Sequence, residues 1–331
     1  MRQQGMAGLT VEDLSIDIAG ASVVDGVSFS VGGGEVMALV GESGCGKSLT
    51  AFALLGLLPD AAEVTQGHIL LDGLDLASLS ERELRRLRGS KLSIIFQEPT
   101  ASLDPLATIG SQIAEAYRLH HKVSRREALA KARAMLVSVG IPDPDRRLTQ
   151  YPFELSGGMC QRVMIAIALI CGPDILIADE PTTALDVTIQ AQILDLMKQL
   201  VAERGTGIVL ITHDMGVVAD IADRVAVMYA GRIAEIGPVD DIFAQPSHPY
   251  TALLLASVPR LDVSPKERLA TIDGSVPSPE RFGPGCRFNE RCPLADGRCR
   301  IDTPPLLAHR PGHFSACWHA DRVSEIARAA A

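Results

Sequence analysis

Apolar and polar residues alternate at residues 9–18 and 23–31, as they do in strands that bury one face. A continuous apolar run follows at residues 35–40 and is typical of a strand buried on both faces. This run leads through a glycine-rich loop into a helical pattern at residues 47–57. The opening of the chain therefore predicts an antiparallel edge layer followed by a strand–loop–helix unit.

Strand and helix patterns continue to alternate further along the chain. Strands are expected at residues 92–96, 174–178, 207–211 and 226–229, and helices at residues 109–117, 124–139, 159–170 and 187–201. The middle of the chain, about residues 98–172, is mostly helical and is expected to be an insert. Such alternation predicts an α/β fold in which helices cover a parallel sheet.

The texture of the chain changes beyond residue 237, where proline and glycine become dense and periodicity soon fades. We therefore predict two domains, residues 1–258 and a small C-terminal domain at residues 259–331. The second domain holds four of the seven cysteines and the only tryptophan, Trp318. The charge-dense stretch at residues 81–88 is interpreted as a solvated helix face, with a docking patch as the alternative.

Composition narrows the class of protein. The net charge of -9 argues against a nucleic-acid binder, which would show a basic face. No apolar run reaches the roughly 18 residues that span a bilayer, and the N-terminus lacks the pattern of a signal peptide. We therefore expect a cytoplasmic protein without a membrane-spanning segment. In that reducing compartment its cysteines are better explained as core residues or metal ligands than as disulfides.

Residues 41–48 have the pattern G-x-x-x-x-G-K-S between a predicted strand and a predicted helix. The glycines permit a tight curl whose amides point at phosphates, Lys47 reaches the outer phosphates, and Ser48 can ligate magnesium. The candidate nucleotide-binding residues are Gly41, Glu42, Ser43, Gly44, Cys45, Gly46, Lys47 and Ser48. A chance glycine turn is the bland alternative, and the flanking elements argue against it.

A second candidate site lies where an apolar strand ends in two carboxylates, Asp179 and Glu180. Asp179 is predicted to hold magnesium, and Glu180 to orient or deprotonate the attacking water. Ser156, Gly157 and Gly158 form a further candidate, because a serine followed by two glycines at a helix start can approach a phosphate. The loop at residues 41–48 is already committed to one phosphate group, so one chain is predicted to carry two half-sites.

Six short segments occur in the order typical of ABC ATPases, and the chain resembles that family over about residues 8–258. The segments are residues 41–48, Gln97, residues 155–159, residues 175–180, residues 184–186 and His213. The chain is also similar to the oligopeptide/dipeptide importer branch of that family in three places: the sequence at residues 96–105, the sequence at residues 248–251 and the tail after residue 276. That branch also serves nickel and some glycosides or opines.

The resemblance implies a P-loop NTPase core with a RecA-like parallel sheet, an antiparallel β subdomain and an α-helical subdomain. It also implies that ATP lies between the loop of one subunit and Ser156 of an identical or related second ATP-binding subunit. Gln97 would contact magnesium and water, His213 the outer phosphate, and Asp186 the other subunit. Two permeases and an extracytoplasmic solute-binding protein are the implied further partners. Two positions depart from the family pattern: Ile18 replaces an aromatic residue that stacks on adenine, and Cys160 replaces a basic residue.

The resemblance thus predicts an ATPase subunit of an importer on the cytoplasmic face of the membrane. A soluble ABC ATPase acting on DNA or ribosomes is the alternative, although such proteins usually have two cassettes in one chain or long coiled-coil arms.

The tail cysteines Cys286, Cys292, Cys299 and Cys317 have the spacing C-x5-C-x6-C-x17-C. Four thiolates suit a 4Fe–4S cluster or a tetrahedral zinc. Zinc ribbons normally use closely spaced C-x2-C pairs, which this tail lacks, so the spacing favours iron and sulfur. Zinc, and four unligated thiols or occasional disulfides, remain alternatives, and a sensory tail that gates the ATPase is a third interpretation of the function.

Overall fold

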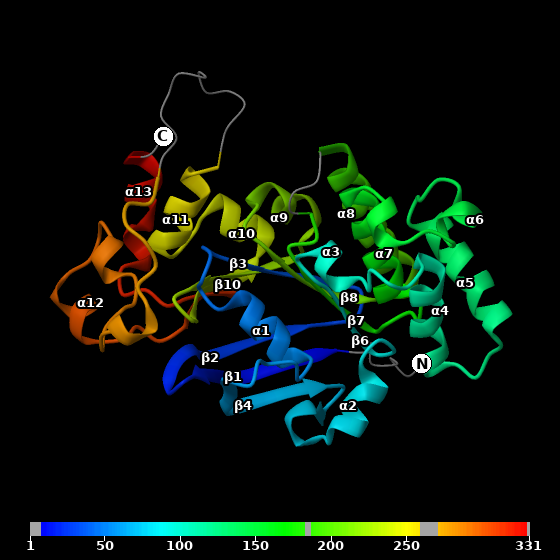
Figure 1. Cartoon of the computed structure of the whole chain (residues 1–331). Coiled ribbons are helices and arrows are strands. Elements are labelled where there is room, and N and C mark those ends of the chain that lie inside the picture. The colour runs from blue at the N-terminus through cyan, green and yellow to red at the C-terminus, as the bar shows by residue number, and fades with distance from the viewer. Residues whose placement is uncertain (1–7, 183–186, 259–270, 330–331) are drawn as a thin grey trace, which may run out of the picture. The chain divides into compact units, whose positions relative to one another are not determined.

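The computed structural model describes residues 8–182, 187–258 and 271–329, which form two compact units. The first unit comprises Met1–Leu9, Val31–Val36 and Leu71–Ile211, and the second comprises Thr10–Ser30, Met37–Leu70 and Thr212–Ala331. Each unit therefore combines segments that are distant in the sequence (Figure 1). The predicted boundary between residues 258 and 259 meets a segment outside the described residues and stays a prediction.

The first unit contains three neighbouring parallel strands. They are β6 (Leu92–Ile95), β7 (Ile175–Asp179) and β8 (Gly207–Thr212), in the order β6-β7-β8. Every residue of β7 and β8 is buried, which explains why both segments are continuous apolar runs. Because the strands are parallel, residues that follow β6 and β7 meet at one edge of the sheet.

The predicted helical insert is present in the first unit. Helices α4 (Ile109–His120), α5 (Arg125–Ser138) and α7 (Gly157–Leu169) pack on one another (Figure 1). Helix α5 begins with a capping box in which Glu127 N–H donates to Ser124 Oγ and Ser124 N–H donates to Glu127 Oε2. The other elements of the unit are β5 (Leu74–Asp75), α2 (Glu81–Leu87), α3 (Pro99–Ser102), α6 (Pro144–Arg147) and α8 (Val187–Arg204), with 3-10 turns at Leu76–Ser78 and Pro152–Glu154.

The second unit contains a mixed sheet in the order β11-β12-β10-β9-β3. Its strands are β3 (Val36–Val40), β9 (Arg224–Tyr229), β10 (Arg232–Pro238), β11 (Leu307–Arg310) and β12 (His313–Ser315). Strand β3 is parallel to β9, and the remaining neighbours are antiparallel. The sequence patterns did not predict β10, β11 or β12. Of these, β11 and β12 belong to the tail, so the tail contributes strands to the sheet that contains β3, the strand before the phosphate-binding motif.

The predicted edge layer is formed by β1 (Leu9–Ile18), β2 (Ala21–Val31) and β4 (Ala62–Leu71), in the order β2-β1-β4. Helix α1 (Lys47–Leu54) is shorter than expected because Gly56 has a φ of 62°, a conformation that ends helices. The further helices are α9 (Met215–Ile221), α10 (Val239–Ala244), α11 (Pro249–Ala256), α12 (Gly297–Ile301) and α13 (Val323–Ala329), with 3-10 turns at Pro279–Arg281, Asn289–Arg291 and Ala320–Arg322.

The last described helix, α13, packs within the second unit. Helix α13 lies beside α11, and Val323 and Ile326 are buried against Ala252 of α11 (Figure 1). Among the described residues, no helix is both long enough and apolar enough to span a membrane.

Candidate functional site

The phosphate loop, residues 41–48, connects β3 to α1 in the second unit. Gly41 has a φ of 153°, and a Cβ there would stand 2.2 Å from the Met228 carbonyl oxygen. Gly46 has a φ of 103°, and its Cβ would stand 2.9 Å from Met228 Cε. No L side chain fits either position without strain, so the first and last glycines of the motif are required by the local packing.

Lys47, the first residue of α1, reaches back over this loop. Its Nζ donates to the carbonyl oxygens of Gly41 at 2.8 Å and of Glu42 at 2.9 Å, and the side chain is buried. An ammonium group held by carbonyls at the start of a helix provides positive charge where phosphate oxygens bind. Cys45 is fully buried, and burial raises the pKa of its thiol, so it contributes packing and backbone to the loop.

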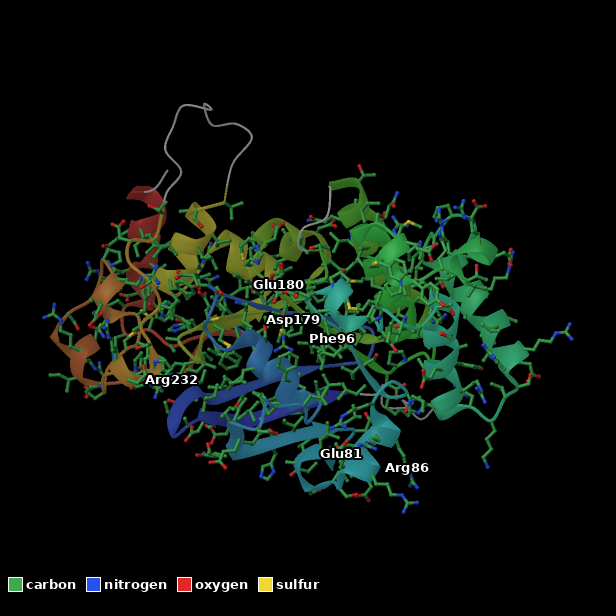
Figure 2. The ribbon with its side chains drawn as sticks, viewed as in Figure 1. Glu81, Arg86, Phe96, Asp179, Glu180 and Arg232 are labelled. Atoms are coloured by element: carbon green, nitrogen blue, oxygen red, sulfur yellow. The ribbon has the colours of Figure 1, made fainter. Side chains whose placement is uncertain are left out.

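The first unit brings Gln97 and Glu180 together. Gln97 follows β6 and Glu180 follows β7, and Gln97 Nε2 donates to Glu180 Oε2 at 2.9 Å. Figure 2 labels Glu180, its neighbour Asp179 and Phe96, the residue before Gln97. Glu180 has a φ of 47°, and its N–H donates to the Ile211 carbonyl oxygen at 2.9 Å. This left-handed backbone conformation is uncommon for a residue other than glycine. Asp179 ends β7 and is 3% exposed, so a buried carboxylate directly precedes Glu180 in the chain.

Ser156 and Gly157 are exposed at the start of α7. Ser156 caps the helix, because its Oγ accepts a hydrogen bond from the Met159 N–H at 3.4 Å. An exposed helix start with a small hydroxyl and two glycines can reach a phosphate held by another molecule. Cys160 is buried in the same helix, and burial raises the pKa of its thiol, as expected for a small apolar residue.

His213 and Asp186 are the remaining predicted site residues in the body of the chain. His213 is exposed after β8, and the next residue, Asp214, caps α9 through hydrogen bonds from the N–H groups of Gly216 and Val217. Asp186 lies outside the described residues. Ser48 is half-buried in the first turn of α1.

Sequence reasoning missed the residues that support the phosphate loop from the far end of the chain. Glu42 N–H donates to Tyr250 Oη at 2.9 Å, and Arg291 Nη1 lies 2.9 Å from Glu42 Oε2. Tyr250 belongs to the His-Pro-Tyr-Thr motif at residues 248–251. This motif contributed to the family resemblance but did not predict the contact with Glu42. Arg291 had no such signal, because a single arginine in a loop has no pattern.

A buried network of hydrogen bonds around Glu235 holds the segment that leads into Tyr250. Glu235 of β10 accepts hydrogen bonds from the N–H groups of Ser247 and His248, and His313 Nε2 lies 2.6 Å from Glu235 Oε1. His248 Nδ1 accepts from the Tyr250 N–H at 3.1 Å and so caps α11. Burial lowers the pKa of His248 to about 4, so this ring is neutral at pH 7.

The four tail cysteines, Cys286, Cys292, Cys299 and Cys317, line one small pocket together with Phe288 and Trp318. Burial, with a smaller contribution from the neighbouring thiols, raises the pKa of Cys317 to about 12 and that of Cys292 to about 11. Four sulfur donors are the ligand set of a 4Fe–4S cluster or of a tetrahedral zinc. Among the described residues, however, the only three donor atoms found within 4.8 Å of one another belong to Asp296, Cys299 and His319.

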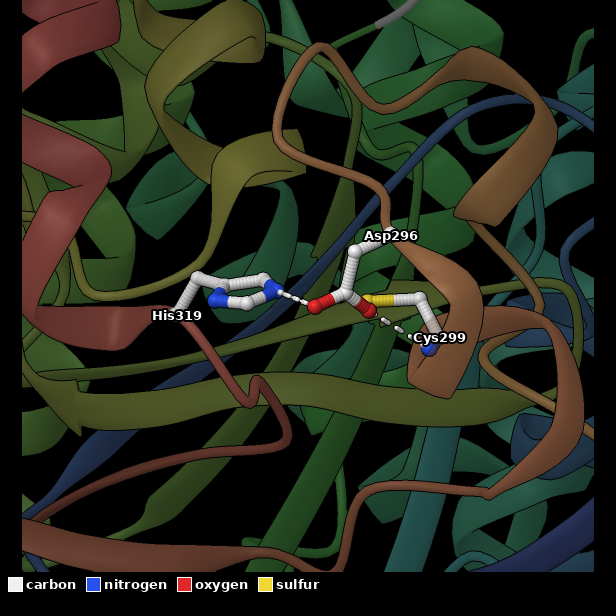
Figure 3. Close-up of side chains that lie close together, drawn as sticks. All are labelled: Asp296, Cys299 and His319. Carbon is white, nitrogen blue, oxygen red and sulfur yellow. Dashed lines mark hydrogen bonds and ion pairs between the residues drawn. The ribbon is translucent and has the colours of Figure 1, made fainter.

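A second group of donors shares Cys299. The ligand atoms of Asp296, Cys299 and His319 lie within 4.8 Å of one another (Figure 3). His319 Nε2 stands 3.1 Å from one Asp296 oxygen, and the other accepts from the Cys299 N–H at 3.0 Å. The Cys299 N–H is the main cause that lowers the pKa of Asp296. This arrangement holds the start of α12 and offers one carboxylate, one thiol and one imidazole to a cation.

Two family models match the chain. One, described as ABC transporter, matches residues 24–183, and the other, described as oligopeptide/dipeptide transporter, C-terminal region, matches residues 234–299. The solved dimeric structure of a post-hydrolysis state of the ATP-binding cassette MJ0796 bound to ADP and Pi is 27% identical. It superimposes with a TM-score of 0.63 over 70% of this chain and 98% of that one.

Curated relatives match nearly the whole chain. The probable peptide ABC transporter ATP-binding protein y4tR of Sinorhizobium fredii is 52% identical, with 96% of each chain covered. The dipeptide transport ATP-binding protein DppD of Bacillus subtilis is 52% identical, again with 96% of each covered. The oligopeptide transport ATP-binding protein OppD of Salmonella typhimurium is 48% identical over 94% of this chain and 93% of its own. The chain therefore belongs to the ATP-binding subunits of the oligopeptide/dipeptide ABC transporter family, and it is an ATPase with the α/β ABC cassette fold.

Proposed function

We propose that this subunit binds and hydrolyses Mg-ATP to energise uptake of dipeptides or oligopeptides through an ABC importer. The hydrogen bond between Gln97 and Glu180 carries the catalytic part of the proposal, because it places a carboxylate beside an amide that can orient water. The relatives y4tR, DppD and OppD are named as ATP-binding proteins of peptide, dipeptide and oligopeptide transport, which supports the peptide class. Nickel, a glycoside or an opine is the alternative cargo.

Each site residue has a defined task in this proposal. Lys47 and the amides of residues 43–48 bind the phosphates, and His213 contacts the outer phosphate. Glu180 accepts the proton of the attacking water, Gln97 orients that water, and the bond from the outer phosphorus to ADP breaks as the new bond to the water oxygen forms. Ser48, Asp179 and Gln97 would hold Mg²⁺, which would neutralise negative charge on the phosphates.

A second ATP-binding subunit, identical or related, completes each site with its own Ser156, Gly157 and Gly158. The exposure of Ser156 and Gly157 on the surface supports this role. Asp186 is proposed to contact the other subunit. Single-turnover hydrolysis by a mixture of Lys47→Ala and Ser156→Arg chains tests the homodimer. Each variant is inactive alone, and their mixed dimer regains one intact site; absence of recovery would indicate a related partner chain instead.

Docking on two permeases is proposed at the helical insert beside Gln97, on the cytoplasmic face of the membrane. Two loops of the first unit meet there through hydrogen bonds from Ile109 to Gln150 and from Gly110 to Leu148. They present the exposed apolar side chains Leu106, Tyr151 and Phe153, of which Leu106 is 87% exposed. An extracytoplasmic binding protein would deliver the solute. Phe153→Asp should abolish co-purification with the permeases, whereas Val137→Asp, at an exposed apolar position on α5, should not.

We further propose that the four tail cysteines hold a 4Fe–4S cluster with a structural or sensory role, and that zinc is the alternative. Their convergence on one pocket supports the donor set. Iron, sulfide and zinc analysis of anaerobically purified protein separates the two. Cys286→Ser should remove iron and the visible absorbance if the four cysteines hold the cluster, and should lower bound zinc instead if they hold zinc.

The Glu180→Gln variant tests the catalytic proposal. It should slow single-turnover ATP hydrolysis by about 10² to 10⁴ and leave Mg-ATP binding intact, because only the proton acceptor is lost. The matched control is Glu154→Gln, an exposed carboxylate on a turn of the same unit, which should hydrolyse ATP at the wild-type rate. A wild-type rate in Glu180→Gln would refute the assigned role.

A further inference from the structure

We infer that Arg291, in the four-cysteine tail, is a positioning residue for ATP binding: it neutralises and orients Glu42 inside the phosphate loop. The inference rests on the proposed role of that loop in binding ATP. Glu42 is the second residue of the loop, and the Arg291 side chain comes from 249 residues further along the chain.

The guanidinium group of Arg291 is fixed by its surroundings. Nη1 lies 2.9 Å from Glu42 Oε2 and 3.2 Å from Tyr229 Oη, while Nε and Nη2 donate to the backbone oxygens of Asp273 and Ile272. The Arg291 side chain is 8% exposed and that of Glu42 is 26% exposed. The tail backbone therefore aims a buried cation at one carboxylate oxygen, a geometry that a loose surface ion pair does not have.

Charge gives this contact its effect on ATP. A carboxylate in the phosphate loop repels a triphosphate, and the repulsion is stronger where water is excluded. The other oxygen of the Glu42 carboxylate, Oε1, is buried and has no hydrogen-bond partner in the part of the chain that the structure describes. Pairing with Arg291 cancels the negative charge of Glu42 and holds its side chain in one position. Removing Arg291 would leave an uncompensated anion beside the phosphates.

The contact also joins the phosphate loop to the cysteine pocket. Arg291 immediately precedes Cys292, and the Cys286 N–H donates to the Cys299 carbonyl oxygen at 2.8 Å within the same tail. Phe288 packs its ring 5.0 Å from that of Tyr229 and 5.3 Å from that of Tyr250. The conformation of the four-cysteine region therefore sets the position of Arg291, and through it the affinity of the loop for ATP.

Mg-ATP titration of the full-length chain tests the inference, with the single-turnover rate at saturating ATP as the second readout. Arg291→Ala should raise the Kd about tenfold and change the saturated rate much less. Glu42→Gln in the Arg291→Ala background should restore most of the affinity, because it removes the unpaired charge. The Kd of Arg291→Lys should lie between those of the wild type and Arg291→Ala. Lysine keeps the positive charge but lacks the several N–H donors of the planar guanidinium group.

Arg287→Ala is the matched control, because Arg287 is an equally buried arginine of the same tail that pairs with Asp25. Glu42→Gln should give no rescue in that background. Should Arg291→Ala fail to fold, Glu42→Gln alone decides: tighter ATP binding supports the inference, and weaker binding overturns it. An unchanged Kd in Arg291→Ala, or a loss that Glu42→Gln does not rescue, overturns the inference and leaves the proposed function standing. Failure of the wild type to bind ATP, or normal binding by Lys47→Ala, would instead overturn the proposed function.

Discussion

The hydrolysis pair in the first unit and the phosphate loop in the second are supported in different ways. Gln97 and Glu180 follow neighbouring parallel strands, and one hydrogen bond joins them. The phosphate loop instead depends on Tyr250 and Arg291, which are 208 and 249 residues away from Glu42 in the sequence. The comparison teaches that the proposed hydrolytic residues are held by neighbouring strands of one sheet, whereas the proposed phosphate loop is contacted by residues from distant parts of the chain.

The largest predicted effect on the binding side is that of Lys47→Ala. Loss of the charge-assisted hydrogen bonds proposed from Lys47 to phosphate should weaken Mg-ATP binding by about 10²-fold or more. Equilibrium titration measures this effect. Lys91→Ala is a suitable control and should leave ATP affinity unchanged. Lys91 and its ion-pair partner Asp174 both belong to the first unit, whereas the phosphate loop belongs to the second.

Acid should lower the free energy of unfolding of the second unit through His248. Burial lowers the pKa of this histidine from 6.5 to about 4. The unfolded chain binds a proton below pH 6.5 that the folded chain takes up only near pH 4, so stability is complete above pH 6.5 and falls between these values. The loss approaches about 3 kcal/mol. Chemical unfolding from pH 4 to 7 measures it. His248→Asn keeps an acceptor for the Tyr250 N–H and should flatten the profile; an unchanged slope would exclude His248 as the cause.

Gln97→Ala should act on the first unit alone. Without the amide that orients water and contacts the Glu180 carboxylate, single-turnover hydrolysis should fall about tenfold with ATP affinity preserved. Rapid-quench measurement at saturating ATP checks this prediction. A fall in affinity with a normal saturated rate would show that Gln97 belongs to the binding side of the comparison.

Tyr250→Phe should have the smallest effect. It removes the acceptor of the Glu42 N–H hydrogen bond and should weaken ATP binding about fivefold. The same titration measures it. Tyr117→Phe, at a tyrosine in α4 of the other unit, is the control and should bind ATP like the wild type.

The sequence predicted the hydrolysis pair more completely than the phosphate loop. Buried strands leave apolar runs, and parallel strands place their carboxyl ends together, so Gln97 and Glu180 could be located from pattern and family resemblance. The loop glycines were located in the same way, and their φ values confirm the required curl. Arg291 and Glu235 could not be found, because their partners come from distant loops and strands, and neither residue lies in a periodic segment. The four cysteines were recognisable by spacing, and the structure places them around one pocket.

Measurement of Mg-ATP Kd and saturated single-turnover rate on the same samples of Glu180→Gln and Arg291→Ala tests the division between chemistry and binding most directly. The predicted result is a crossed pattern: Glu180→Gln loses rate and keeps affinity, and Arg291→Ala loses affinity and largely keeps rate. If both variants lost the saturated rate to a similar extent with unchanged affinity, the tail would not act through binding and the account would be contradicted.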